Sequence, residues 1–261
     1  MTQAISDLHA IWNNDGYVLL PGFFDLPSVS LLSNYLDEIS RWEISEDKWM
    51  MWFEKTTKNE LIVSRVENFI DYHEALKNVI FSDNRIVTII TDLFHENPVL
   101  FKDRIIFKFP DSGGYQPHQD AYCKIYRLPQ REVFTVVTLF VDDATEANGC
   151  MYVAPGKHKL GILKSDDRGV MYEEDYKNYT WKPIICKAGD VLLFDNYLPH
   201  YSNMNKSNKP RRAIYFPYQK ESSVSLARTQ YYVKKREIAP PEKPHKDINN
   251  LYKQNEIFYR E

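Results

Sequence analysis

Two histidines, an aspartate and an arginine have the residue types and spacing to hold a metal ion and an organic acid. His118 and Asp120 stand two positions apart in GGYQPHQDAYCKIY, just after a pair of glycines. On a β-strand, side chains at i and i+2 lie on the same face, so both can reach one ion. His200, in DNYLPHYSN, follows the apolar stretch AGDVLLFD, and we expect it at a strand end. Two neutral imidazoles and one carboxylate leave the other positions of an ion open, which favours non-haem Fe(II) and oxygen activation.

Arg211, in NKPRRAIYFPY, comes eleven positions after His200. If YSNMNKSNKP is a hairpin loop between two antiparallel strands, Arg211 begins the returning strand and lies within a few residues of the metal. A guanidinium group forms bidentate pairs with carboxylates and stays charged when partly buried. Such a set suits a 2-oxoacid with a distal carboxylate. Alone, an HxD pair is more often two surface residues and an arginine a surface charge, so the prediction depends on the four residues together.

Composition limits the classes of protein that this chain can belong to. Its 261 residues are 43% hydrophobic, enough for the core of one large domain. A formal net charge of −3 argues against a nucleic-acid partner, and no apolar run is long enough to span a bilayer. MTQAISDLHAIWNNDGY lacks the pattern of a secretory signal, and three widely spaced cysteines indicate reduced thiols. We expect a cytoplasmic protein with a small-molecule substrate and no obligate protein partner.

The order of the expected elements positions these residues on a β-barrel. One short strand in DGYVLLPGFF and helices in DLPSVSLLSNYLDEISRW, IDYHEALKNVIF and NRIVTIITDLF predict a mainly helical region over about 1–98. VLFKDRIIFKFP alternates as a half-buried strand, and many short strands follow, which predicts an antiparallel barrel or sandwich over about 99–220. Residues 162–183 lack either period and form a long loop, a candidate lid. A polar extension over about 221–261 completes a single domain.

Three separated stretches and the N-terminus together resemble a known family. FPDSGGYQPHQDAYC, DDATEANGCMYVAPGKHKLG and AGDVLLFDNYLPHYSNMNKSNKPRRAIYFPY, with the opening DGYVLLPGFFDLPSV, are similar to the phytanoyl-CoA dioxygenase (PhyH) family. The resemblance implies a mainly β fold with flanking helices, a double-stranded β-helix of the jelly-roll or cupin-like type. It also implies an Fe(II)- and 2-oxoglutarate-dependent dioxygenase that uses O2.

The resemblance assigns roles to individual residues. His118, Asp120 and His200 match the iron ligands and catalytic centre. Arg211 matches the arginine for the distal carboxylate of 2-oxoglutarate, with Ser202 as its hydroxyl partner.

The resemblance also assigns roles to residues other than the iron ligands, Arg211 and Ser202. Arg212 is the alternative to Arg211 for the distal carboxylate of 2-oxoglutarate if the match to the family motif is shifted by one residue. Thr138, Arg104 and Arg65 match positions that contact the cosubstrate.

The implied reaction is hydroxylation of a substrate C–H bond with release of succinate and CO2. Relatives that halogenate replace the carboxylate of the HxD pair, so Asp120 favours hydroxylation. Tyr122, Lys124 and Tyr126 follow the pair, and Lys108 lies on the neighbouring strand. These four are expected to contact a small polar substrate, zwitterionic or phosphonate-bearing, because FPDSGGYQPHQDA is similar to aminoalkylphosphonate hydroxylases and tyrosine faces bind cationic ammonium groups.

Three alternatives stay open at this point. The same oxygenase chemistry, as hydroxylation, desaturation or ring formation, could act on a natural-product intermediate. The fold could be a non-catalytic binding module for a metal or small molecule, although the ligand set with Arg211 argues against that. A cupin-type isomerase is the third, but cupins usually have more histidines near the first pair.

Overall fold

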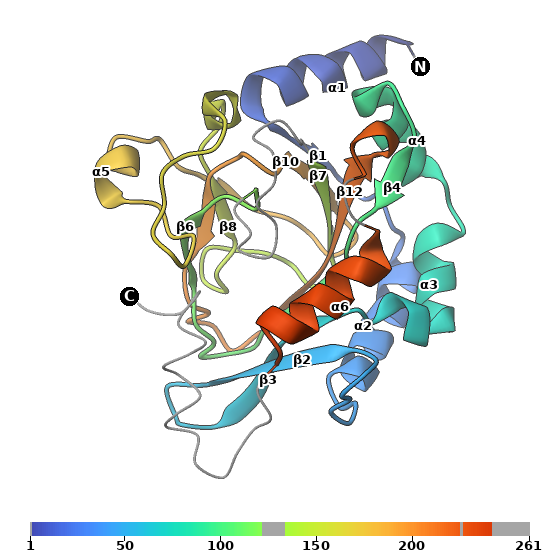
Figure 1. The fold of residues 1–261 in the computed structure, drawn as a ribbon, viewed down its shortest axis with the longest axis vertical. Coiled ribbons are helices and arrows are strands. Elements are labelled where there is room, and N and C mark those ends of the chain that lie inside the picture. The colour runs from blue at the N-terminus through green and yellow to red at the C-terminus, as the bar shows by residue number, and fades with distance from the viewer. Residues whose placement is uncertain (1, 122–133, 225–226, 242–261) are drawn as a thin grey trace.

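The fold is built on two antiparallel sheets that face each other (Figure 1). The computed structural model describes residues 2–121, 134–224 and 227–241. The large sheet has the order β1-β10-β7-β12-β5-β3-β2, with β4 paired to β12, and the small sheet has the order β6-β11-β8-β9. The prediction of an antiparallel barrel is therefore confirmed. The strands are β1 (Tyr17–Leu20), β2 (Met50–Lys55), β3 (Leu61–Glu67), β4 (Pro98–Leu100), β5 (Arg104–Lys108), β6 (Tyr115–His118), β7 (Phe134–Phe140), β8 (Met151–Val153), β9 (Lys182–Ile184), β10 (Val191–Asp195), β11 (His200–Ser202) and β12 (Arg211–Lys220).

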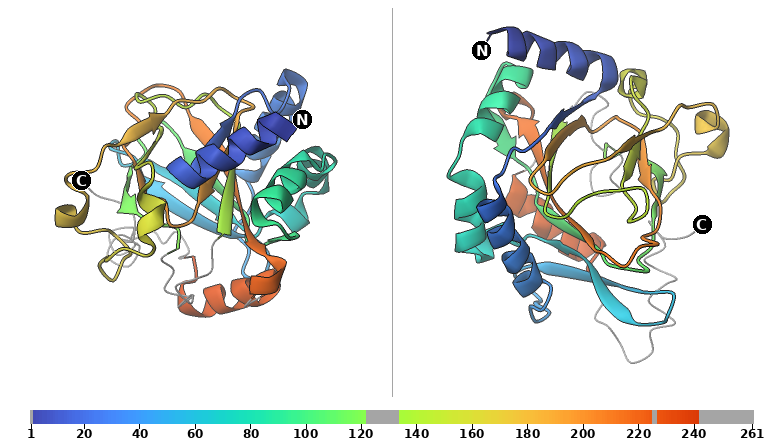
Figure 2. Two further views of the ribbon diagram at one scale, coloured as in Figure 1. Left: turned by 90° about the horizontal axis from the view of Figure 1, so that it is seen from above. Right: turned by 180° about the vertical axis from the view of Figure 1, so that it is seen from behind.

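Helices α2, α3 and α4 cover the outer face of the large sheet, on the side away from β6 and β8, whereas α5 lies on the side of the small sheet (Figure 1 and Figure 2). The three predicted helices are confirmed by α2, α3 and α4. In α2 the Asp25 side chain accepts a hydrogen bond from the Ser28 amide and caps the helix, and a proline follows in the first turn. The helices are α1 (Thr2–Asp15), α2 (Leu26–Ile39), α3 (Glu74–Phe81), α4 (Arg85–Phe94), α5 (Glu173–Tyr176) and α6 (Arg228–Ile238).

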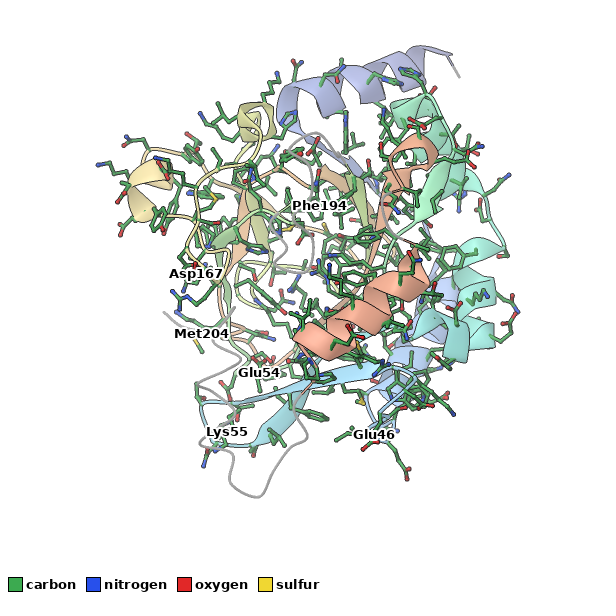
Figure 3. The ribbon with its side chains drawn as sticks, in the orientation of Figure 1. Glu46, Glu54, Lys55, Asp167, Phe194 and Met204 are labelled. Atoms are coloured by element: carbon green, nitrogen blue, oxygen red, sulfur yellow. The ribbon has the colours of Figure 1, made fainter. Side chains whose placement is uncertain are left out.

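Alternation along the strands divides the core into two layers. Ile105 and Phe107 of β5 pack in the apolar cluster shared with the helices. Ile106, between them, packs in the cluster between the two sheets, with Ala213 of β12 and Phe194 of β10. Figure 3 labels Phe194 in the middle of the molecule. Residues of the same parity as Ile106 on β5 therefore point into the space between the sheets.

Two expectations about these elements are wrong. The region expected to be mainly helical contains the β2–β3 hairpin, which extends the large sheet beyond β5. The strand expected to be half-buried, β5, is covered on both faces, and even Lys108 is only 2% exposed. Its alternating charges therefore belong to the interior of the barrel and not to solvent, which explains why alternation alone misassigned that face.

The segment after the barrel returns to the large sheet as α6 (Figure 1). Lys235 of this helix forms an ion pair with Glu67 of β3, and the Tyr232 hydroxyl contacts Asp103. The predicted loop at 162–183 contains the short helix α5 and isolated bridges, one joining Val170 to His118, and its last two residues begin β9. Among the described residues, the helices are all too short or too polar to cross a membrane.

Candidate active site

A cluster of two histidines and one aspartate lies between the sheets. His118 ends β6 and His200 begins β11, and the two are directly opposite in the antiparallel register. This pairing brings the ring centroids to 4.2 Å. Asp120 lies just beyond the end of β6, and one ligand atom from each residue lies within 4.8 Å of the others. The three residues predicted from the sequence therefore meet, although Asp120 is in a turn and not on the strand.

Hydrogen bonds orient both imidazoles. His118 Nδ1 lies 2.7 Å from the Gln116 carbonyl oxygen, and His200 Nδ1 lies 2.9 Å from that of Leu198. A carbonyl oxygen only accepts, so each Nδ1 carries the proton and each Nε2 presents a lone pair. Burial lowers the pKa of His118 to about 3, with help from His200, and burial also lowers the pKa of His200. Both rings are neutral at pH 7, which is the form that binds a metal.

Arg104 fixes the charge state and position of Asp120. Its Nη2 lies 3.1 Å from the Asp120 Oδ2, and the guanidinium stacks over Tyr215 with its centre 4.9 Å from the ring centroid. Burial alone would raise the pKa of Asp120, but Arg104 outweighs it and holds that pKa well below its usual range. The carboxylate is therefore ionised and available as the third ligand.

A second cationic group lies at the other end of β5. Arg211 pairs with Lys108 across the β12–β5 register, and both side chains are only 2% exposed. Lys108 Nζ donates to Ser202 Oγ at 2.8 Å and to the Asn203 carbonyl oxygen at 2.5 Å. Burial lowers the pKa of Lys108 well below its usual value, and Arg211 adds to this. Arg211 Nε and Nη1 are buried without a hydrogen-bond partner in the described residues, so this end of the space has donors ready for an anion.

Alternation along β12 separates the two candidate arginines. Arg212 points to the helical side, where its guanidinium binds Asp142 at 2.8 Å and Asp37 at 2.6 Å and reaches Ser33 of α2. The guanidinium donors of Arg212 therefore form hydrogen bonds within the protein. Arg211 points between the sheets, so this geometry favours Arg211 over Arg212 as the candidate for binding the cosubstrate.

The expectation that β11 and β12 form a hairpin is wrong. β11 lies in the small sheet between β6 and β8, whereas β12 lies in the large sheet between β5 and β7. The connecting loop crosses from one sheet to the other, and Lys108 bridges the gap to Ser202. Close packing allows this: a Cβ on Gly114 would lie 2.5 Å from the Ser202 carbonyl oxygen. Gly114, directly before β6, therefore allows the close contact with the segment after His200.

The remaining predicted residues fall in three places. Thr138 of β7 is fully buried, pairs with Tyr215, and its Oγ1 has no hydrogen-bond partner in the described part of the chain. Arg65 of β3 stacks on Trp52 at 4.0 Å and lies 3.3 Å from Glu67, at a distance along the sheet from Arg211. The expected substrate contacts Tyr122, Lys124 and Tyr126 lie outside the described residues.

Sequence reasoning missed two lysines of this region, Lys102 near Asp120 and Lys235 at Glu67. Lys102 is only 9% exposed, and its charge also lowers the pKa of Asp120. Lys235 lies in α6, more than a hundred residues further along the chain, and no local signal connects it to the site. Lys102 did carry a signal, since it has the same parity as Arg104 in KDRIIFK.

The donor set fits both an iron ion and an oxoacid. Two neutral imidazoles and an ionised carboxylate gathered on one side match the ligands that non-haem Fe(II) prefers and leave open positions. The guanidinium donors of Arg211 that have no partner in the described part of the chain fit a carboxylate. The arrangement can hold a metal and an organic dianion side by side in a water-poor space.

Comparison with known proteins agrees with this geometry. Among solved structures, EctD from S. alaskensis, crystallised with 2-oxoglutarate and 5-hydroxyectoine, matches with a TM-score of 0.72 and 20% identity over 84% of this chain and 77% of that one. The 2-aminoethylphosphonate dioxygenase of the uncultured bacterium HF130_AEPn_1 is 33% identical over 232 residues, 88% of this chain and 87% of that protein. The methylphosphonate hydroxylase of Gimesia maris is 32% identical over 225 residues, 86% of this chain and 84% of that protein.

The fold and the site define a non-haem iron, 2-oxoglutarate-dependent dioxygenase on a double-stranded β-helix. Residues 12–213 match the family described as phytanoyl-CoA dioxygenase (PhyH), and the chain belongs to that family.

Proposed function

We propose that this protein hydroxylates a C–H bond of a small polar molecule that bears a phosphonate group and, in the zwitterionic case, an amine. The reaction consumes 2-oxoglutarate and O2 and releases succinate and CO2. The observation that carries the proposal is the similarity, over more than four fifths of the chain, to two relatives whose names specify phosphonates. The cationic surroundings of Asp120 support an anionic substrate.

His118, Asp120 and His200 would hold the iron through the two Nε2 atoms and one carboxylate oxygen. When bound, the iron supplies oxygen activation coupled to oxidative decarboxylation of 2-oxoglutarate. The protein's part is to keep the imidazoles neutral and Asp120 ionised. The hydrogen bonds from Nδ1 to the Gln116 and Leu198 carbonyl oxygens and the ion pair from Arg104 do so.

Arg211 and Ser202 would bind the distal carboxylate of 2-oxoglutarate. Lys108 belongs with them and not with the substrate, because its Nζ donates to Ser202 and the residue pairs with Arg211 in the β12–β5 register. Donors from these three residues would fix the orientation of a flexible dianion and exclude water from it. Thr138 Oγ1, which has no hydrogen-bond partner among the residues that the structure describes, lies on the same inner face.

The test is a panel of candidate substrates for stimulated succinate release by Fe(II)-loaded protein. The panel contains 2-aminoethylphosphonate, methylphosphonate, the carboxylate analogue β-alanine, several amino acids and a long-chain acyl-CoA. We expect a phosphonate to raise succinate release at least about tenfold over the substrate-free rate, with one hydroxylated product per succinate, and His200→Ala to abolish both. Stimulation by the acyl-CoA alone, or by no phosphonate, would contradict the proposal.

A further inference from the structure

The side chain of Lys102 is largely buried and forms no ion pair with any residue that the structure describes, although its charge acts on Asp120. The residue is 9% exposed and lies in the connection between β4 and β5. Among the described residues it has no ion pair and no hydrogen bond to its ammonium group, in contrast to Lys235, Lys187 and Lys220. Burying a charge without a partner is costly, so a group of this kind is expected to meet an anion at some stage of the protein's work.

Aromatic rings connect Lys102 to two further cations. Its ammonium lies 5.9 Å from the centroid of the Tyr231 ring, and Lys235 lies 5.6 Å from the same ring. Lys235 in turn lies 4.8 Å from the Trp52 ring, on which Arg65 stacks at 4.0 Å. These contacts line up three cations from three separate parts of the chain along one aromatic wall.

The same wall continues to the candidate iron ligands. Arg104 is two positions after Lys102, it pairs with Glu67 in the β3–β5 register, and its guanidinium binds Asp120. Glu67 is also the partner of Lys235 and Arg65. Within the described ranges, the carboxylates that interact with Arg65, Lys102, Arg104 and Lys235 are those of Glu67 and Asp120. The excess of positive charge lies next to Asp120, where a substrate must approach.

We propose that Lys102, with Arg104 beside it, is the subsite for the dianionic head group of the substrate, a phosphonate. The inference rests on the proposed function and adds to it the residues that would determine the substrate class. Arg104 and Lys108 are four residues apart on β5, roughly 13 Å. The end of the space between the sheets at Lys108 would therefore take the cosubstrate carboxylate. The end at Arg104, near the candidate iron ligands, would take the substrate phosphonate.

Lys102→Met is the informative variant, because methionine keeps the length of the side chain and removes its charge. Calorimetric titration of methylphosphonate into protein loaded with Fe(II) and 2-oxoglutarate, without oxygen, measures the subsite directly. We expect Lys102→Met to weaken methylphosphonate binding roughly 10- to 100-fold. Lys102→Arg should retain most of the affinity, and Lys234→Met, at an exposed lysine of α6, should not change it. Methanesulfonate, a monoanion of the same shape, should bind the wild-type protein more weakly than methylphosphonate.

Two parallel measurements separate the possible outcomes. The melting temperature of Lys102→Met should equal or exceed that of the wild type, because an unpaired buried charge has been removed; a structural lysine would lower it. Titration of 2-oxoglutarate into the same Fe(II) protein should be unaffected by Lys102→Met. Equal methylphosphonate affinity in the wild type and Lys102→Met, or no binding to the wild type, would overturn the inference, whereas failure of the wild type to bind 2-oxoglutarate would overturn the proposed function itself.

Discussion

At the scale of single residues, strand alternation decides which arginine can serve the chemistry. Arg211 and Arg212 are neighbours in the sequence, yet one points between the sheets and the other binds acids beside α2. The guanidinium of Arg212 donates hydrogen bonds to Asp142. In Arg211, Nε and Nη1 have no hydrogen-bond partner among the described residues. Substitutions at the two positions should therefore have separable effects.

Arg211→Met should raise the KM for 2-oxoglutarate by 30-fold or more, because a buried charge-paired anchor is worth about 2–5 kcal/mol. Succinate release at varied 2-oxoglutarate concentration measures the change. Arg212→Met is the matched control: it should lower the free energy of unfolding by about 1–3 kcal/mol, since Asp142 loses its partner, and leave that KM within about twofold. The reverse pattern would assign the cosubstrate to Arg212.

Asp195 offers a test of buried charge away from the site. Burial raises its pKa to about 6, although its Oδ1 accepts a hydrogen bond from the Tyr197 amide. An acid whose pKa is raised on folding binds its proton more tightly when folded, so the folded state loses stability as pH rises from about 4 to 6. Above pH 6 the full penalty remains.

Asp195→Asn should therefore stabilise the protein at pH 7 by up to about 3 kcal/mol and make no difference below pH 4. The amide oxygen keeps the hydrogen bond from Tyr197. Denaturant unfolding at several pH values measures the difference between the two proteins. A variant that is less stable than the wild type at pH 7 would indicate that ionised Asp195 has a favourable partner.

How much of the site the sequence could predict depends on how local the signal is. His118, Asp120, His200 and Arg211 stand in short motifs, and the structure brings them together. Lys108 was predicted on the right strand and as a substrate contact; its hydrogen bond to Ser202, which comes from the other sheet, could not be predicted from the sequence. Lys235 was missed, since only the docking of a distant helix brings it to Glu67.

At the scale of elements, the pairing of β6 with β11 assembles the candidate metal ligands. The sequence predicted both strands but not their connection to β12, because an apparent hairpin loop can equally cross between sheets. It also missed β2 and β3, whose sequences MMWFEK and LIVSRVE follow a helix and are separated by a polar turn. Their position is set by pairing with β5 and not by local preference alone.

Gly114→Ala should weaken this pairing and lower iron affinity. A methyl group there would lie 2.5 Å from the Ser202 carbonyl oxygen, so the strands must separate. We expect a loss of stability of about 1–3 kcal/mol and fewer iron ions retained per protein after gel filtration. In Gly22→Ala the added methyl meets no atom within 4 Å, so this control should lose some stability at its left-handed backbone but retain iron. Equal iron content in all three proteins would argue against the role given to Gly114.

At the scale of the whole molecule, α6 attaches the end of the described chain to the sheet edge. The Tyr232 hydroxyl accepts a hydrogen bond from the Asp103 amide and donates to the Asp103 carbonyl oxygen, both at 2.9 Å. Arg228 of the same helix binds the Asp103 carboxylate, which is fully buried. The helix thereby holds Lys235 beside Glu67 of β3 and Tyr231 in the apolar cluster with Trp52 and Phe101.

Tyr232→Phe should lower the free energy of unfolding by about 1–3 kcal/mol, because it leaves the buried Asp103 amide without an acceptor. Chemical denaturation measures this, with Val233→Ala, at an exposed position of α6, as the control that should stay within about 0.5 kcal/mol. A Tyr232→Phe variant as stable as the wild type would mean that α6 is held by its apolar and ionic contacts alone.

Binding of 2-oxoglutarate to Fe(II)-reconstituted protein without oxygen tests the central claim most directly. An oxoacid that chelates Fe(II) gives a visible charge-transfer absorption, so the titration reports iron and cosubstrate together. The wild type should saturate at one equivalent, and His200→Ala should give no such band because one of three ligands is gone. Absence of the band in the wild type, or an unchanged titration in His200→Ala, would contradict the assignment of this site.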